Sequence, residues 1–156
     1  MADDLSRAKD LAYRYLGLRA RSRKELTAYL VKKEFAPDIV SEVMAVMESY
    51  GYVDDRKFAA MFARHLVGTK GLSRYAVRQE LRRKGVTDED AALAILALDS
   101  EEDADTEYEV ALRVARNKAA GLAGIPPEKA RRRLTDYLRR RGYSFGVVSG
   151  VLREVL

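Results

Sequence analysis

The sequence contains no cysteine and a single histidine, His65. Without thiols, the chain cannot form disulfide bonds, thiolate metal sites or cysteine nucleophiles. One histidine cannot build a multi-histidine zinc site, and a serine–histidine triad would have to use His65, which has no nucleophile elbow near it in the sequence. We therefore interpret His65 as an ordinary residue of an amphipathic helix and predict no catalytic residues and no metal site.

Long apolar runs and phosphate-binding loops are missing as well. No stretch approaches the roughly 20 apolar residues that span a membrane, and residues 1–5 lack the basic-then-apolar pattern of a signal peptide. There is no GxxxxGK[ST] loop for a nucleotide, and the glycine-rich stretch 121–124 precedes two prolines, so we interpret it as a flexible linker. The sequence therefore predicts a cytoplasmic protein that is not an enzyme, carries no cofactor and contacts no membrane.

Apolar residues recur at helical spacing along the whole chain, whereas alternation with a period of two is almost absent. This pattern predicts an all-α fold. Ser22, Ser73 and Thr87 are suited to cap helix N-termini. The pair Asp54 and Asp55 could serve metal binding or acid–base chemistry, but we favour a helix cap there as well. The predicted helices span residues 5–18, 22–34, 37–50, 55–68, 73–84, 88–98, 101–117, 127–141 and 144–155.

Three similar repeats follow one another along the chain. Laid over one another without gaps, the segments beginning at Ser22, Ser73 and Ala130 match at their apolar positions over about half of each repeat. The offset from Ser22 to Ser73 gives repeats of about 50 residues, enough for three helices each. Stacked repeats of this kind form an elongated, curved array. The predicted repeats are residues 1–54, 55–100 and 101–156.

Charge is unevenly distributed along the chain. The formal net charge is +5, but residues 99–109 alone carry −7 and residues 110–156 carry +8. A strongly basic surface favours an acidic partner, either a nucleic acid or an acidic protein. Two interpretations of the acidic strip 99–109 stay open: a solvated helix start and junction, which we favour, or an internal ion partner for a basic face.

Basic residues gather at the end of the middle helix of each repeat. Cations near a helix C-terminus are favoured by the helix dipole, which accounts for one or two of them. The dipole disfavours the run 131–133, which lies at the other end of the third repeat's helix, so we predict that an acidic partner docks there. The predicted binding residues are Arg64, Lys70, Arg74, Arg78, Arg82, Arg83, Lys84, Arg131, Arg132, Arg133, Arg139, Arg140 and Arg141.

Residues 51–59, GYVDDRKFA, resemble the GY[IV]DD-x-x-[FY]-A signature of the RecX family. The turn at 70–71 and the ELRRKGV sequence at 80–86 are similar to the family's second block, a KG turn followed by EL-x-x-KG[IV]. The start at 22–26, SRKEL, matches the family's SR-x-EL. The resemblance has specific motifs over residues 5–98 and continues more loosely to the end, because the third repeat has a longer loop and an arginine-rich helix.

The resemblance implies tandem three-helix repeats without catalytic residues or a cofactor. It also implies a negative regulator that lies in the groove of the RecA–DNA filament and inhibits the ATPase, strand-exchange and coprotease activities of RecA, thereby modulating recombinational DNA repair and the SOS response. We expect a monomer whose partner is the RecA filament. The alternative is a helical repeat protein that binds single- or double-stranded DNA directly.

Overall fold

The computed structural model describes residues 2–156, which form helices joined by turns and loops and contain no strand. The predicted all-α class is therefore confirmed. None of the described helices is both long enough and apolar enough to cross a membrane. The helices are α1 (Ala2–Leu18), α2 (Arg23–Lys32), α3 (Pro37–Ser49), α4 (Asp55–Gly68), α5 (Arg74–Arg83), α6 (Asp88–Asp99), α7 (Glu107–Ala120), α8 (Pro127–Arg140) and α9 (Phe145–Val155).

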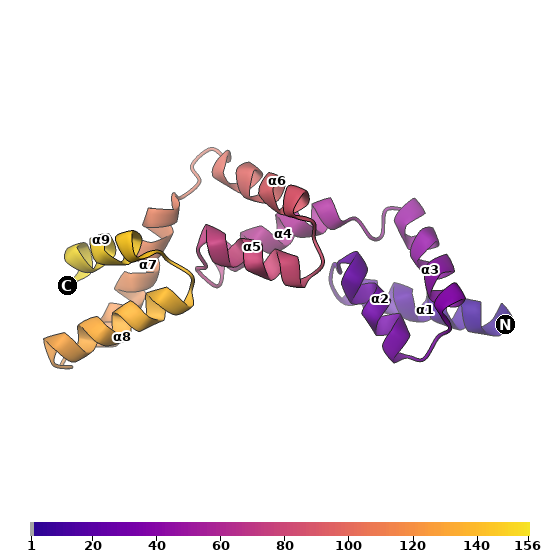
Figure 1. Ribbon diagram of the computed structural model, residues 1–156, viewed down its shortest axis with the longest axis horizontal. Helices are drawn as coiled ribbons and strands as arrows, with labels where there is room; N and C mark the ends of the chain where they lie inside the picture. The colour runs from indigo at the N-terminus through magenta and orange to yellow at the C-terminus, as the bar shows by residue number, and fades with distance from the viewer. Residues whose placement is uncertain (1) are drawn as a thin grey trace.

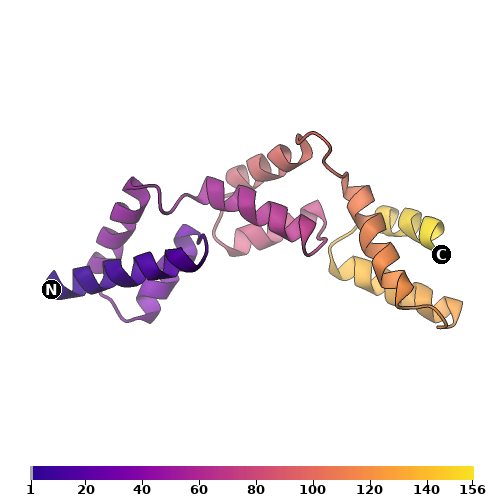
Figure 2. The ribbon, with the colours of Figure 1, turned by 180° about the vertical axis from the view of Figure 1, so that it is seen from behind.

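The helices pack in three consecutive groups, which we call unit 1 (α1–α3), unit 2 (α4–α6) and unit 3 (α7–α9). Figures 1 and 2 show that the units follow one another along an elongated, curved line with the chain ends far apart. In Figure 1, α6 lies at the upper edge of the array and α8 at the lower edge. The predicted array of three-helix repeats is therefore confirmed.

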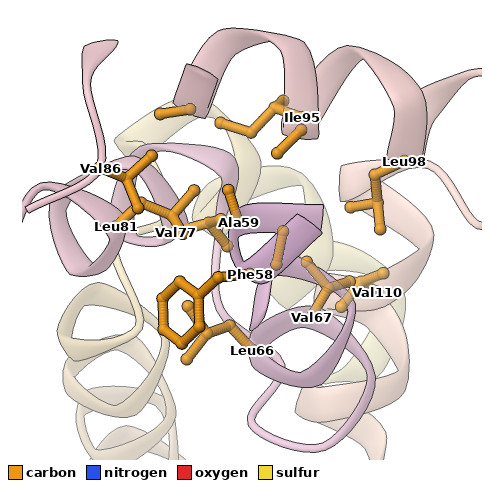
Figure 3. Packing of buried hydrophobic residues seen from close by; sticks show 13 residues of the cluster. Phe58, Ala59, Leu66, Val67, Val77, Leu81, Val86, Ile95, Leu98 and Val110 are labelled. Carbon is orange, nitrogen blue, oxygen red and sulfur yellow. The ribbon is translucent and has the colours of Figure 1, made fainter. Parts of the chain in front are cut away.

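Each unit has an apolar core of its own. Figure 3 shows the core of unit 2, where Phe58 of α4, Leu81 of α5 and Ile95 of α6 gather between the three helices. Val110, at the start of α7, belongs to this core as well and so ties unit 3 to unit 2. The stretch 121–124 forms turns, and Leu122 anchors it in the core of unit 3.

Side chains cap the helices where the sequence predicts it. Ser22 and Ser73 are completely buried, and each accepts a hydrogen bond from the backbone N–H three residues further on. Asp54 accepts hydrogen bonds from the N–H groups two and three residues further on, at the start of α4. Such caps satisfy donors that the first helical turn leaves free. The interpretation of Asp54 as a helix cap is therefore confirmed.

The two junctions between units are built alike. Gly85, after α5, lies against unit 1, where an added Cβ would stand 2.7 Å from Lys24 Cβ. Gly142, after α8, lies against unit 2, where an added Cβ would collide with Ser73 Oγ. Both glycines have left-handed backbones, with φ of 83° and 90°. The corresponding residue of unit 1 is Glu34, which is exposed and has a φ of 68°.

The predicted helix over 101–117 is wrong at its start, because α7 begins at Glu107. Thr106 caps this helix by accepting a hydrogen bond from the Glu109 N–H, 3.1 Å away. Asp103 has a φ of 65°, a conformation that cannot continue a right-handed helix. Residues 101–105 therefore form a loop between units 2 and 3 rather than a first helical turn.

Candidate binding surface

Most of the basic residues predicted to bind a partner from unit 2 are ion-paired within the protein. Three exposed arginines have a carboxylate oxygen within 3.1 Å: Arg64 with Glu101, Arg82 with Asp88, and Arg83 with Glu80. Such exposed pairs add little stability, but they neutralise charge that a partner would otherwise meet. Of the predicted residues of unit 2, only Lys70 and Arg78 are without an ion pair to another residue of 2–156.

Arg74 lies beneath the acidic strip, with a side chain that is only 14% exposed. Its Nε donates to Asp99 Oδ1 at 2.9 Å, its Nη2 donates to the backbone carbonyl of Asp105, and its backbone N–H donates to Glu107. Its Nη1 is buried without a hydrogen-bond partner. Arg74 therefore fastens the loop between units 2 and 3 instead of contributing to a basic stripe with Arg78.

Three acids of the strip 99–109 are internal ion partners, as the less favoured of the two interpretations expects. Asp99 and Glu101 pair with arginines of unit 2, and Asp105 pairs with Arg113 of α7. The favoured interpretation of a helix start and junction fits the rest of the strip, because residues 101–105 form the loop between units 2 and 3 and Glu107 and Glu109 lie in the first turn of α7. The strip thus balances positive charge on both sides of the second junction.

Lys84 points at the neighbouring unit. Its Nζ lies 3.4 Å from Glu25 Oε2 of unit 1. Burial would raise the pKa of the Glu25 carboxyl, but hydrogen bonds from Arg19 and from the Ser22 N–H, together with the charges of Lys84 and Arg19, hold this pKa below its ordinary value of 4.5. Glu25 therefore joins the cap of α2 to the first junction.

Arg141 has the corresponding place at the second junction. Its Nε donates to the Lys70 carbonyl of unit 2 at 3.2 Å, and its own carbonyl accepts the Ser73 N–H at 3.0 Å. The guanidinium also lies over the Tyr137 ring, 3.8 Å from the ring centroid. Lys84 and Arg141 thus both have structural contacts between units.

The exposed side of α8 differs from the ion-paired and junction residues described above. It carries five exposed arginines, and none of them forms an ion pair with any residue from 2 to 156. Uncompensated guanidinium groups produce a positive potential and suit bidentate contacts with carboxylates or phosphates. The α8 arginine face, as we call it, consists of Arg131, Arg132, Arg133, Arg139 and Arg140.

The histidine and the acidic pair that could have served chemistry, His65 and Asp54–Asp55, lie on α4 and at its start, not on α8. His65 is exposed on α4, with its ring 6.3 Å from that of Phe62. Within residues 2–156, no cluster of three or more histidine, aspartate or glutamate side chains is placed to hold a metal ion. The candidate surface consists of charged groups on helix exteriors, an arrangement suited to contacts with another macromolecule.

Sequence reasoning missed the partners of the unit 2 arginines. Arg64 and Arg74 lie 37 and 25 residues from Glu101 and Asp99, so no helical spacing connects them. A local signal was present at residues 106–109, TEYE, which fits the capping-box pattern of a serine or threonine followed by an acid three residues later. That signal places 101–105 outside the helix, within reach of the arginines.

Comparison with known protein families finds three adjoining matches. Residues 8–45 match the first three-helix domain of RecX, residues 54–95 match the second, and residues 105–152 match the third. These matches together cover most of units 1, 2 and 3.

Individual relatives agree with the family matches. The chain is 35% identical over 150 residues to the regulatory protein RecX of Amycolatopsis mediterranei, covering 96% of this chain and 83% of that one. It is 37% identical over 143 residues to the regulatory protein RecX of Mycolicibacterium smegmatis, covering 88% and 73%. The crystal structure of RecX from Lactobacillus salivarius has the same fold, with a TM-score of 0.76 and 21% identity over 99% of this chain and 98% of that one. The chain belongs to the RecX family.

Proposed function

We propose that this protein binds the filament that RecA forms on DNA and inhibits the ATPase, strand-exchange and coprotease activities of RecA. Its relatives are named regulatory proteins, which favours a binding role over catalysis. Through this inhibition the protein modulates recombinational repair and the SOS response. The observation that carries the proposal is the α8 arginine face.

The shape of the array and the unpaired arginines of α8 both suit binding to a filament that contains DNA. A curved array of repeats offers an extended surface that can follow a groove. DNA supplies regularly spaced phosphates, and each arginine that neutralises one releases a condensed counterion. The five arginines of α8 can do so without first breaking an internal ion pair, whereas Arg64, Arg74, Arg82 and Arg83 cannot.

The direct test measures the DNA-dependent ATPase of RecA while this protein is added at sub-stoichiometric amounts. We expect the rate to fall and the protein to sediment with the RecA–DNA filament. An unchanged ATPase rate together with no co-sedimentation would refute the proposal.

A pair of variants tests the contribution of the α8 arginine face. Arg132→Glu with Arg139→Glu reverses two of its charges, and we expect at least about tenfold more protein to be needed for half-inhibition. The matched control, Arg14→Glu with Lys32→Glu, changes the net charge equally at exposed positions of unit 1. If both pairs weaken inhibition equally, net charge rather than this face is responsible.

Direct binding to DNA is the second candidate function, because the unpaired guanidinium groups of α8 also suit phosphates. Fluorescence anisotropy with labelled single- and double-stranded oligonucleotides separates the two functions. A direct DNA-binding protein should bind near physiological salt without RecA. The logarithm of its binding constant should fall with the logarithm of salt concentration, with a slope of about −0.9 per phosphate contact on duplex DNA. Such binding, combined with an unchanged RecA ATPase, would favour the second function.

A further inference from the structure

The side of α6 that faces away from the core of unit 2 is apolar. Along the other side of the helix, Ile95 and Leu98 enter the core, as Figure 3 shows. Leu93 and Leu96, one helical turn apart, remain 45% and 63% exposed. Between Glu89 and Asp99, every exposed residue of α6 is apolar. The α6 outer face, as we call it, consists of Ala92, Leu93, Leu96 and Ala97.

The repeats provide an internal comparison for this face. In the repeat alignment, Leu93 corresponds to Glu42 of α3 and to Gly150 of α9. Leu96 corresponds to Ala45 of α3 and to Arg153 of α9. The same fold is therefore built twice in this chain without large apolar side chains at these positions. The fold therefore does not require the two exposed leucines. Contiguous exposed apolar residues that are surrounded by charged residues mark interaction surfaces, so we interpret the leucines as part of one.

The α6 outer face is held firmly and is bordered by negative charge. Arg56 pairs with Asp90 at the start of α6, and Arg64 pairs with Glu101 just beyond its end, so α4 fixes α6 at both ends. Three further acids around the two ends form no ion pair with any residue from 2 to 156: Glu89, Glu102 and Asp103. A complementary partner therefore presents apolar side chains beside lysine or arginine.

We propose that the α6 outer face docks on a RecA subunit of the filament, at a site where apolar side chains lie beside basic ones. This inference rests on the proposed function and extends it. The α6 outer face would contact the RecA protein, whereas the α8 arginine face would contact acidic groups of the filament. The two helices, α6 and α8, lie at opposite edges of the array in Figure 1. One molecule can thus contact two chemically different surfaces at once.

A second copy of this chain is a poorer occupant. Both ends of α6 are acidic, so two α6 outer faces packed in either direction would bring like charges together. The exposed side of α8 offers arginines and no large apolar residue to meet Leu93 and Leu96.

The test exchanges the two leucines for the residues that unit 1 carries in the same helical positions. Leu93→Glu with Leu96→Ala copies Glu42 and Ala45, so the helix should be retained. Leu93→Met with Leu96→Met is the matched apolar control. A second variant, Leu96→Arg, copies Arg153 of unit 3 and places a positive charge against the basic rim of the partner.

Binding is measured by co-sedimentation with RecA filaments on single-stranded DNA, and helix content by circular dichroism. We expect Leu93→Glu/Leu96→Ala and Leu96→Arg to bind filaments at least about tenfold more weakly, while the methionine pair binds like the original protein. Binding of all variants to the same DNA without RecA should be unchanged.

Each other outcome has a definite meaning. Equal filament binding by folded variants overturns the docking surface and leaves the proposed function standing, whereas failure of the original protein to bind filaments overturns the proposed function. An equal loss of binding to bare DNA overturns the assignment to RecA. A dimer in analytical ultracentrifugation that Leu93→Glu/Leu96→Ala converts to monomer assigns the face to a second copy instead.

Discussion

Tyr143 shows how one residue can be adapted to its place in an array. In the repeat alignment it corresponds to Phe35 and Val86, which are purely apolar. Tyr143 is 2% exposed, and its hydroxyl donates to the Gly71 carbonyl of unit 2 at 2.7 Å. Burial, with the nearby negative charge of Glu107, raises the pKa of this hydroxyl to about 12. The ring completes the core of unit 3 while the hydroxyl joins that core to unit 2.

We expect Tyr143→Phe to lower the free energy of unfolding by about 1–3 kcal/mol, because it leaves a buried carbonyl without its donor. Urea unfolding followed by circular dichroism measures the difference. Tyr75→Phe is the control, since Tyr75 is 66% exposed. Equal losses in both variants would mean that the buried hydrogen bond contributes nothing.

The raised pKa of Tyr143 also predicts a loss of stability at alkaline pH. The pKa in the folded protein lies above the ordinary 10.0, so this residue's contribution is complete below pH 10 and is lost as pH rises through about 12. Phenolate absorbance should show a tyrosine that titrates near pH 12 and is missing in Tyr143→Phe. A titration curve unchanged by the substitution would contradict the shift.

Two effects of replacing Gly142 can be measured separately: the steric collision of an added Cβ and the cost of a left-handed backbone. Gly142 and Gly124 have similar φ values of 90° and 85°, but nothing lies within 4 Å of a Cβ added at Gly124. Both alanine substitutions carry the cost of a left-handed backbone. Gly142→Ala should cost about 2 kcal/mol more, because its Cβ also collides with Ser73 and Ala76. Urea unfolding measures both variants. Equal losses in the free energy of unfolding would show that the junction accommodates the added methyl group without strain.

Among the elements, the start of α2 combines a local cap with a contact between units. Ser22 and Glu25 form a reciprocal capping box, and Glu25 also accepts contacts from Arg19 and from Lys84 of unit 2. The carboxylate that begins this helix therefore also holds the next unit. This double use accounts for the partial burial of a charged residue at a helix N-terminus, where the dipole favours an acid.

We expect Glu25→Gln to lower the free energy of unfolding by about 1–2 kcal/mol at neutral pH. The pKa of Glu25 is lowered in the folded protein, so its ionic contribution is complete above 4.5 and is lost as pH falls through the lower value. The two proteins should therefore converge in stability at acidic pH. Glu42→Gln, at an exposed position, is the control for urea titrations across this range.

The elements could be predicted from the sequence because their signals are local. Periodicity gave the helices, and caps such as Ser73 and Asp54 gave their starts to within a residue. The predicted start of α7 is wrong because it places the acids before Glu107 in a first helical turn, although Thr106 provides the cap. The ion pairs of Arg74 could not be predicted, because they depend on how the loop before α7 folds back over α5.

At the scale of the whole molecule, each unit carries its own core and touches its neighbours at few points. Stability should then be a sum of unit and junction contributions, as in other repeat arrays. The sequence predicted this architecture because repeated residues reveal repeated structure. It did not predict which basic residues remain unpaired, because charge along a sequence does not show which carboxylates the fold brings near.

Disturbing the first junction should therefore leave unit 3 unaffected. We expect Gly85→Ala to accelerate amide hydrogen exchange at core positions of units 1 and 2, such as Leu26 and Leu81, because its Cβ would press on Lys24. Exchange at Leu134 in unit 3 should not change. Uniform acceleration in all three units would show that the array unfolds as one body.

The left-handed residue after the middle helix also limits how such an array could grow by gene duplication. Unit 2 and unit 3 have glycine at this position, and each fits closely behind another unit. A duplicated copy of unit 1 in the same setting would bring the side chain of Glu34 into that contact. Adding such a copy in tandem would therefore require a glycine at this position or a rearranged contact with the preceding unit.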